Sequence, residues 1–216
     1  NPVVVLAKLG NTSFTLNNDA FIDSTNVITY AGTLQIKNPA LWSPTNPNLT
    51  DLKIYVINAG DTIAMQEIKV GIRKTELKTD GFYLNGTKLF LRGTNRHQEY
   101  PYVGYAVPDN AQKRDAQLIK DAGFNFVRLS HYPQSPAFYE ACDALGIIVM
   151  DAIAGWQHFG PPPFEQRCKD DLREMIRRDR NHPSVVFWEN SINETQMPES
   201  FMVEMNEIAK SLLKGQ

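Results

Sequence analysis

The chain has 216 residues, of which 42% are apolar and 21% charged, and its formal net charge is −2. This balance is typical of a folded protein with a sizeable core, and it argues against a nucleic-acid partner, which requires a basic surface. No apolar run approaches the ~20 residues that a membrane-spanning helix needs, so we expect no membrane partner either, while the compartment stays open.

Residues 1–75 read as β-structure. Their β-branched and aromatic runs are separated by clusters of Asn, Asp, Gly and Pro, and no helical period interrupts them. The predicted strands are "VVVLAKL", "VITYAGTLQI", "LKIYVINA" and "TIAMQEIKVGI". This pattern is typical of an antiparallel sandwich, although the roughly seven strands of an immunoglobulin domain are not all there. We expect an incomplete immunoglobulin-like β-sandwich with Trp42 closing one end.

Residues 76–216 alternate strands and helices. A hairpin is predicted on Asn85-Gly86, a pair that favours a type I′ turn. Four nearly continuous apolar runs follow, each succeeded by a helical pattern, and the last helix is expected at residues 198–213. These runs are "KLFLRG", "FNFVRL", "IIVMD" and "SVVFW". Such runs are typical of a parallel sheet covered by helices.

The helices have recognisable boundaries. Gln112 stands three residues after Asp109 in the position of a capping box, and Ser135 precedes a proline at the start of the next helix. Cys142 and Cys168 fall on helix faces, so we expect buried free thiols rather than a disulfide.

An open doubly wound sheet and a barrel both begin with such βα units. No glycine-rich fingerprint follows the first strand, as it would in a dinucleotide-binding fold. Doubling the four units gives about 250 residues, the usual size of a (β/α)8 TIM barrel. We therefore expect the first half of a TIM barrel, an α/β fold. Its fourth strand would be an open edge, which favours self-association into a homo-oligomer.

Polar residues gather where the four strands end, and in a barrel these ends meet at one mouth. They are Asn95, Arg96, His97, Arg128, His131, Asp151, Trp156, His158, Asn193 and Glu194. Several interpretations remain open at this point. Arg128 could pair with an acid for stability alone, and Glu189 is expected to be an ion-pair partner. Trp156 could pack a loop or stack against a sugar ring.

A metal site of His97, His131, His158 and Asp151 is a further alternative, although no ligand spacing such as HxxxH supports it. A metal-dependent hydrolase would need these ligands to converge. We favour a binding pocket instead, with Asp151 and Trp156 among the residues that line it; the family resemblance given below implies that its ligand is an oligosaccharide or β-glycoside.

Five ordered motifs, between about residues 40 and 195, carry a family resemblance. They are "LWSPTNPNL", "GIRK", "FYLNGTKLFLRGTNRH", "FNFVRLSHYP" and "RDRNHPSVVFWENSINE". The chain resembles glycoside hydrolase family 2, the family of β-galactosidases and β-glucuronidases. The resemblance implies a retaining enzyme for terminal β-D-glycosides, built from a jelly roll, an immunoglobulin-like domain and a barrel. This chain would cover the second domain and half of the third.

The resemblance also implies residue roles. Glu194 would be the acid/base catalyst, Asn193 would bind the sugar's 2-hydroxyl, and the sugar pocket would include His97, Arg128 and His131. Partial burial and a nearby carboxylate would raise the pKa of Glu194. The family's nucleophile, a glutamate after strand seven, would lie outside this chain, so the chain alone is expected to be inactive.

Two departures bear on the substrate and on cofactors. Family galactosidases often hold magnesium with a glutamate and a histidine after strand three, whereas this chain reads "DAIAGWQHFG", with Ala152 in place of a glutamate. We therefore expect no cofactor, with magnesium as the alternative, because the ligand positions of the family are not matched. The common "WSLGNE" is here "WENSINE". "NRH" favours a β-galactosidase; a β-glucuronidase, a β-mannosidase or a non-catalytic carbohydrate-binding protein are the alternatives.

Overall fold

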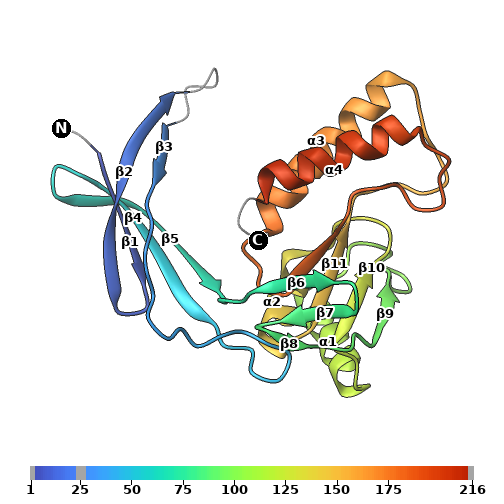
Figure 1. Cartoon of the computed structure of the whole chain (residues 1–216), viewed down its shortest axis with the longest axis horizontal. Helices are drawn as coiled ribbons and strands as arrows, with labels where there is room; N and C mark the ends of the chain where they lie inside the picture. Colours follow the sequence, from blue (N-terminus) through green and yellow to red (C-terminus); the bar gives the residue numbers. More distant parts are fainter. Residues whose placement is uncertain (1–2, 23–27, 214–216) are drawn as a thin grey trace. The chain divides into compact units, whose positions relative to one another are not determined.

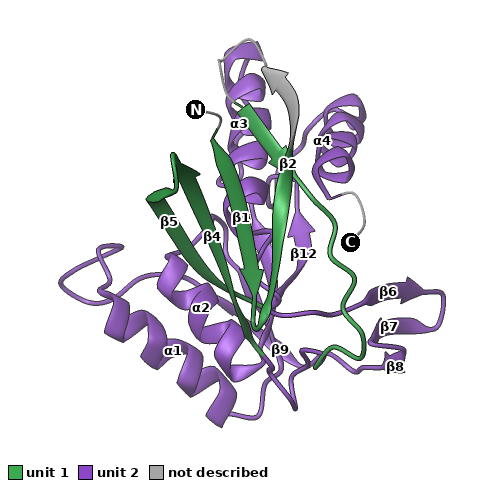
Figure 2. Cartoon of the chain, turned by 90° about the vertical axis from the view of Figure 1, so that its left-hand side faces the viewer, with its two compact units in different colours: residues 1–40, 49–70 green, residues 41–48, 71–216 purple. Residues whose placement is uncertain are grey.

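The computed structural model describes residues 3–22 and 28–213 (Figure 1). Both predicted domains therefore include residues outside the described ones, namely 1–2, 23–27 and 214–216. The chain divides into two units, coloured separately in Figure 2. One comprises residues 1–40 and 49–70, and the other comprises residues 41–48 and 71–216.

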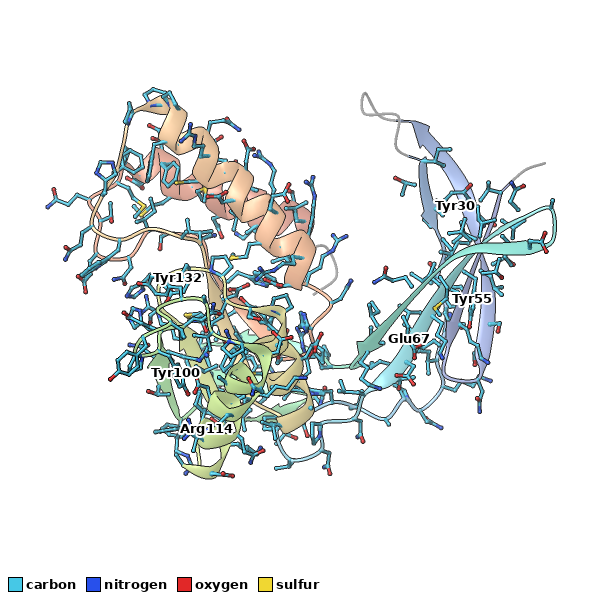
Figure 3. The ribbon with its side chains drawn as sticks, turned by 180° about the vertical axis from the view of Figure 1, so that it is seen from behind. Tyr30, Tyr55, Glu67, Tyr100, Arg114 and Tyr132 are labelled. Carbon is cyan, nitrogen blue, oxygen red and sulfur yellow. The ribbon has the colours of Figure 1, made fainter. Side chains whose placement is uncertain are left out.

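The first unit is an antiparallel sheet in the order β3-β2-β1-β4-β5. Its strands are β1 (Val4–Leu9), β2 (Thr12–Ile22), β3 (Ile28–Ala31), β4 (Thr50–Asn58) and β5 (Asp61–Val70). An ion pair of 3.2 Å between Lys53 and Glu67 links β4 to β5. Glu67 is labelled in Figure 3. Within the described residues of this unit the strands form this one sheet, the partial sandwich that the sequence predicts.

Strand β2 is one that the residue pattern does not indicate. It contains Asn17, Asn18 and Asp19, residue types that are depleted in strands. Its backbone nevertheless pairs with β1, where Leu16 lies opposite Val5, and with β3 on the other side. Hydrogen bonds to two neighbouring strands thus outweigh the weak propensity of the sequence.

Trp42 belongs to the second unit, so the prediction that it closes the sandwich is wrong. The side chain is fully buried, and Nε1 donates to the backbone oxygen of Asp143 at 2.8 Å. Asn85 Nδ2 donates to the backbone oxygen of Trp42 at 3.0 Å. The indole therefore packs where its N–H finds an acceptor, as a buried Trp requires.

The second unit begins with the antiparallel sheet β6 (Thr75–Lys78), β7 (Gly81–Leu84) and β8 (Thr87–Lys88). Asn85 and Gly86 connect β7 to β8 with φ of 53° and 79°, which confirms the predicted type I′ turn. The turn is also tied back to the preceding chain, because Asn85 Oδ1 accepts from Lys74 N at 2.9 Å.

A parallel sheet follows, with the order β12-β11-β10-β9. Its strands are β9 (Gly93–Arg96), β10 (Phe126–Leu129), β11 (Ile148–Ala152) and β12 (Val185–Glu189). The helices are α1 (Asp109–Asp121), α2 (Pro136–Leu145), α3 (Pro162–Asp179) and α4 (Glu199–Leu212). Strands in sequential order are those of a barrel, whereas a doubly wound sheet reverses its order. The unit is therefore the first half of a TIM barrel.

The first barrel strand lies later than the sequence predicts. The apolar run Lys88–Gly93 suggests a strand, but Lys88 ends β8 and Phe90 is 79% exposed. The strand is the polar segment Gly93–Arg96, which pairs in register with β10. A Cβ on Gly93 would lie 2.5 Å from the backbone oxygen of Phe126. Close approach of the two backbones, rather than hydrophobic pattern, thus defines β9.

The two faces of the parallel sheet carry different residues. Neighbours in register share a face, and the row Val127, Val149 and Val185 is fully buried together with residues of α1 and α2. Leu129 is buried on the same face, and Arg96 lies beside it in the register. We call this side the helix face. Cys142 and Cys168 are free, buried thiols within the helices, as predicted.

The opposite side is the inner face of the half-barrel. Arg128 lies beside Met150, which in turn lies beside Phe187. Phe187 contacts Phe82 of β7 at a ring distance of 5.2 Å and Phe126 at 6.0 Å. These rings fill one end of the inner face and leave its other end to polar residues. No helix among the described residues is both long and apolar enough to cross a membrane.

Candidate functional site

The centre of the site is a guanidinium on the inner face. Arg128 Nε donates to Glu189 Oε2 at 2.8 Å, and Nη2 donates to Glu189 Oε1. The same Nη2 donates to Asn193 Oδ1 at 2.9 Å. The two charged side chains are only 22% and 16% exposed. Arg128 therefore neutralises Glu189, the expected ion-pair partner, and fixes the carboxamide of Asn193.

Two histidines lie on neighbouring loops beside this pair. The rings of His97 and His131 meet edge-to-face with centroids 5.5 Å apart, and Tyr132 lies 6.3 Å from His97. Burial, and then the nearby Arg128 charge, lowers the pKa of His131. His131 is therefore neutral at neutral pH. Its Nδ1 is buried and has no hydrogen-bond partner among the described residues.

Glu194 lies in a turn just beyond β12 and has a positive φ of 48°. Its Oε2 accepts hydrogen bonds from Trp156 Nε1 at 3.1 Å and from Gln157 Nε2 at 2.9 Å. The Trp156 N–H and then the Gln157 N–H lower the pKa of this exposed carboxyl. The expectation of a raised pKa is thus wrong for this chain, because donors to the charged form outweigh desolvation.

Trp156 lies at the site, with 59% of its surface exposed. Its indole N–H is directed to Glu194 while much of the side chain stays open, so the exposed surface could also contact a sugar. Gln157 is a site residue that sequence reasoning missed. It has a φ of 53°, which few non-glycine residues adopt, and no residue pattern signals this conformation.

Asp151 is not part of this group, and the prediction that it binds substrate is wrong. It lies on the helix face beside Trp188 and has no exposed surface. Its Oδ1 accepts from Tyr139 Oη at 2.9 Å, and its Oδ2 has no hydrogen-bond partner among the described residues. The nearby Asp179 is neutralised by Arg178 at 2.7 Å. Burial, and then the charge of Asp179, raises the pKa of Asp151 well above its usual range.

This environment predicts the effect of Asp151→Asn. The folded state holds a proton that the unfolded chain releases above about pH 4, so folding stability falls as pH rises from there. Asparagine keeps the hydrogen-bonding shape without a titrating group. We expect the variant to be at least as stable as the parent at neutral pH, with a flatter dependence of unfolding free energy on pH, measured by urea denaturation.

Asp80→Asn is the matched control for the direction in which the free energy of unfolding changes with pH. Hydrogen bonds from Tyr83 and Lys88 lower the pKa of Asp80, so its contribution is present at neutral pH and lost as pH falls. This variant should lose only a little stability at neutral pH, because Asp80 is exposed. A marked loss of stability in Asp151→Asn, greatest at neutral pH, would show that Asp151 is buried as a charged group.

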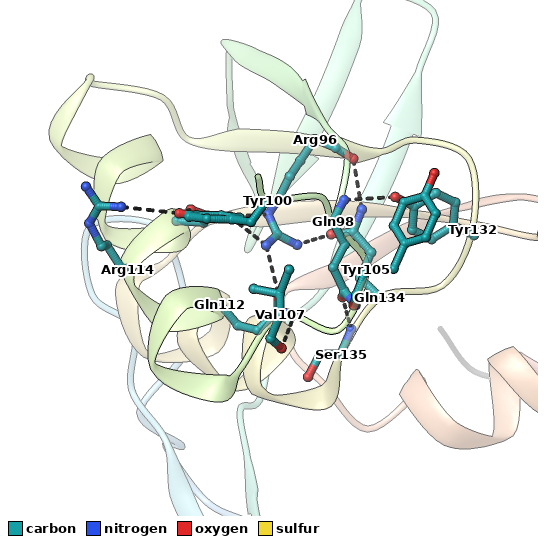
Figure 4. Close-up of polar contacts among 11 residues, drawn as sticks. Arg96, Gln98, Tyr100, Tyr105, Val107, Gln112, Arg114, Tyr132, Gln134 and Ser135 are labelled. Carbon is teal, nitrogen blue, oxygen red and sulfur yellow. Dashed lines mark hydrogen bonds and ion pairs between the residues drawn. The ribbon is translucent and has the colours of Figure 1, made fainter. Parts of the chain in front are cut away.

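Arg96 belongs to the helix face and not to the pocket. Its Nη2 donates to Asp115 Oδ2 at 2.6 Å and to Gln112 Oε1 at 2.7 Å, and Nη1 donates to Gln134 Oε1 (Figure 4). The guanidinium also lies 4.0 Å from the ring centroid of Phe138. Gln112 is therefore not a capping residue: its side chain is buried against Arg96.

Gln98, which follows His97 in the chain, is held by hydrogen bonds as Arg96 is on the preceding side. Its backbone N–H donates to Tyr132 Oη at 2.9 Å, and its Nε2 donates to the backbone oxygen of Tyr105 at 3.1 Å (Figure 4). Its Oε1 accepts from Ser135 N at 2.8 Å. Both chain neighbours of His97 are thus fixed by hydrogen bonds, which positions the imidazole.

The residues present do not fit a metal centre. Among the described residues, no three His, Cys, Asp or Glu side chains gather where they could hold an ion. The ring of His158 packs edge-on against Phe164 at 5.3 Å. The partners of Glu194 Oε2 are N–H donors, which cannot ligate magnesium. We therefore assign no chemical step to a metal.

Two family models match the chain. The model described as "Glycosyl hydrolases family 2, TIM barrel domain" matches residues 75–214, and the model described as "Glycosyl hydrolases family 2" matches residues 4–73.

Individual proteins are similar to it as well. A β-galactosidase of Thermoanaerobacter pseudethanolicus is 44% identical over 181 residues, which are 83% of this chain and 24% of that protein. A crystal structure of a β-galacturonidase from Eisenbergiella tayi, bound to galacturonate, matches 97% of this chain and 39% of its own, with a TM-score of 0.86 and 30% identity. A β-glucuronidase from Parabacteroides merdae matches 97% and 28%, with a TM-score of 0.80 and 30% identity. The chain spans about a quarter of the length of the curated relatives it matches.

Proposed function

Because the chain belongs to glycosyl hydrolases family 2, we propose that it contributes an immunoglobulin-like segment and half of the catalytic barrel to a retaining β-glycosidase. The observation that carries the proposal is the linked set at the end of β12: Arg128 holds Glu189 and Asn193, and Glu194 follows directly. A non-catalytic carbohydrate-binding module would have no need of a carboxyl group oriented in this way.

In the proposed reaction Glu194 is the acid/base catalyst. It gives its proton to the glycosidic oxygen while a second carboxylate attacks the anomeric carbon, so the leaving group departs as an alcohol. Glu194 then removes a proton from water, whose oxygen replaces the enzyme carboxylate and frees the sugar. Asn193 donates a hydrogen bond to the 2-hydroxyl through its amide nitrogen, since its oxygen is occupied by Arg128.

The second carboxylate is proposed to come from a part of the barrel that these residues do not include. A retaining enzyme places it about 5 Å from the acid/base. Asp151 is fully buried on the helix face, and Glu189 is neutralised by Arg128, so neither is a suitable nucleophile. An incoming carboxylate would also raise the pKa of Glu194 in the free enzyme and let it fall once the sugar is attached.

A neutral sugar, most simply a β-galactoside, fits the charges of this site best. A uronic acid brings a carboxylate that requires a free positive charge. Arg128 is already paired with Glu189, and burial keeps His131 neutral. A β-galactosidase is also among the relatives. β-Glucuronidase and β-mannosidase activities are the alternatives.

We expect the purified 216-residue chain to show no turnover of nitrophenyl β-galactoside. We expect a longer polypeptide that carries it with the rest of the family's barrel, here called the full-length enzyme, to hydrolyse this substrate. The reason is that the nucleophile is proposed to lie outside the chain. Release of nitrophenol is the measurement, with the corresponding glucuronide and mannoside as the comparison.

Turnover by the chain alone would contradict the placement of the nucleophile. A full-length enzyme that prefers the glucuronide would contradict the choice of sugar. A full-length protein that binds galactosides without cleaving any of them would contradict the proposed glycosidase activity and favour a binding module.

A further inference from the structure

We propose that Trp156 and Gln157 are positioning residues for Glu194: their side-chain N–H groups hold Oε2, which leaves Oε1 as the oxygen that exchanges protons with the substrate. The inference rests on the proposed function and deepens it, because it assigns the proton to one atom of the carboxyl group.

The hydrogen-bonding capacity of the carboxyl group assigns the proton to Oε1. A carboxylate oxygen has two lone pairs. Oε2 already accepts from Trp156 Nε1 at 3.1 Å and Gln157 Nε2 at 2.9 Å, so both are in use. A proton on Oε2 would displace one donor, whereas a proton on Oε1 displaces neither. The acid form therefore carries its proton on Oε1.

The backbone that carries the two donors is itself fixed by hydrogen bonds. Gln157 N donates to the backbone oxygen of Asn193 at 3.1 Å, next to Glu194. Gly155 N donates to the backbone oxygen of His131 at 3.2 Å. The turn is thus tied both to the segment that carries the acid/base and to the loop after β10.

The backbone conformation is unusual at both ends of the contact between Gln157 and Glu194. Gln157 and Glu194 have φ of 53° and 48°, the left-handed region that non-glycine residues rarely occupy. Gly155 has φ of 140°, and a Cβ there would lie 2.9 Å from Cγ2 of the buried Ile192. Surrounding contacts must over-determine such a turn, and their effect is to aim two N–H groups at one oxygen.

The surroundings of the Glu194 carboxyl group carry little net charge. The titratable group that acts on Glu194 is His131, which burial keeps neutral. The Arg128–Glu189 pair beside His131 is neutralised internally. Asn193 adds a neutral amide. Neutral donors stabilise the carboxylate less than a cation would, so Glu194 can still take up a proton during each reaction cycle.

The direct test is a ¹³C NMR titration of the Glu194 carboxyl in the 216-residue chain, with Glu194→Gln identifying its signal. Trp156→Phe removes one N–H and keeps an aromatic ring, while Gln157→Met removes the other and keeps a side chain of similar length. Because each variant deletes a donor to the charged form, the pKa of Glu194 should rise in both and rise further in the double variant.

Gln166→Met is the matched control, since Gln166 Nε2 donates to Asp170 at 3.0 and 3.1 Å in α3, away from the site. It should leave the Glu194 titration unchanged. An unchanged pKa in the double variant would overturn the positioning role, whether or not the full-length enzyme proves to be a glycosidase.

A kinetic test in the full-length enzyme separates positioning from simple structural support. kcat/KM for an alkyl β-galactoside, whose leaving group needs protonation, should fall about tenfold in each variant. kcat/KM for a dinitrophenyl galactoside, which needs little protonation, should stay within about twofold. The falling alkaline limb of the pH profile should move to higher pH, because the acid must be protonated to act.

Equal losses on both substrates would overturn the inference and favour a stacking role for Trp156. No activity in the unsubstituted full-length enzyme would instead count against the proposed function, and the NMR titration would still decide the positioning role.

Discussion

Replacing Glu194 with glutamine in the full-length enzyme is expected to lower kcat/KM for an alkyl β-galactoside about 10³-fold, the usual scale of general acid catalysis. Glutamine cannot donate a proton to the glycosidic oxygen or accept one from water. For a dinitrophenyl galactoside the loss in kcat/KM should be much smaller, because this leaving group needs little protonation in the first step, the formation of the glycosyl-enzyme. Added azide should restore turnover of that substrate, since an anionic nucleophile needs no base, and should release a β-glycosyl azide.

Glu199→Gln is the matched control, an exposed glutamate in the first turn of α4 that should leave activity unchanged. A Glu194→Gln variant that retains most of its activity on the alkyl glycoside would remove Glu194 from the mechanism. An α-glycosyl azide would show that the enzyme inverts and does not retain configuration.

Replacing Arg96 with methionine is expected to lower the free energy of unfolding of the 216-residue chain by about 3 kcal/mol, because it strands a carboxylate in a largely buried position. Arg96 is 5% exposed, and its partner Asp115 is 18% exposed. The variant also removes donors to Gln112 and Gln134. Urea denaturation followed by tryptophan fluorescence measures the change.

The double variant Arg96→Met/Asp115→Leu should recover much of this loss, since it removes the uncompensated charge. Lys88→Met breaks an exposed ion pair with Asp80 at 3.2 Å and should have little effect. If Arg96→Met lowered the free energy of unfolding as little as Lys88→Met, the buried pair would not stabilise the fold. The role of Arg96 in fixing the chain beside His97 would then need another explanation.

Hydrophobic pattern was sufficient to predict the alternation of strands and helices after residue 75. The apolar runs of β10, β11 and β12 are strands because both faces of a parallel sheet are covered, so nearly every residue is apolar. The same rule failed at β9, whose residues Gly93–Arg96 are polar or small. There the strand is defined by its backbone pairing with β10, which no local pattern records.

The sequence predicted only in part which polar residues face the pocket. Asp151 and Arg128 both lie at or near strand ends, yet register places Arg128 on the inner face and Asp151 on the helix face. A shift of one residue reverses the side of the sheet, so face assignment depends on exact strand boundaries. Sequence reasoning located these boundaries less accurately than it located the strands.

The sequence by itself determined the family resemblance, the half-barrel and the position of Asn193-Glu194 after the fourth strand, because these depend on local motifs and periodicity. Only the tertiary structure decided what surrounds Glu194. Its two N–H donors lie 37 and 38 residues away along the chain, and they reach it through a left-handed turn. Contacts between distant segments arise from packing, and the pKa of a carboxyl group depends on those contacts rather than on its chain neighbours.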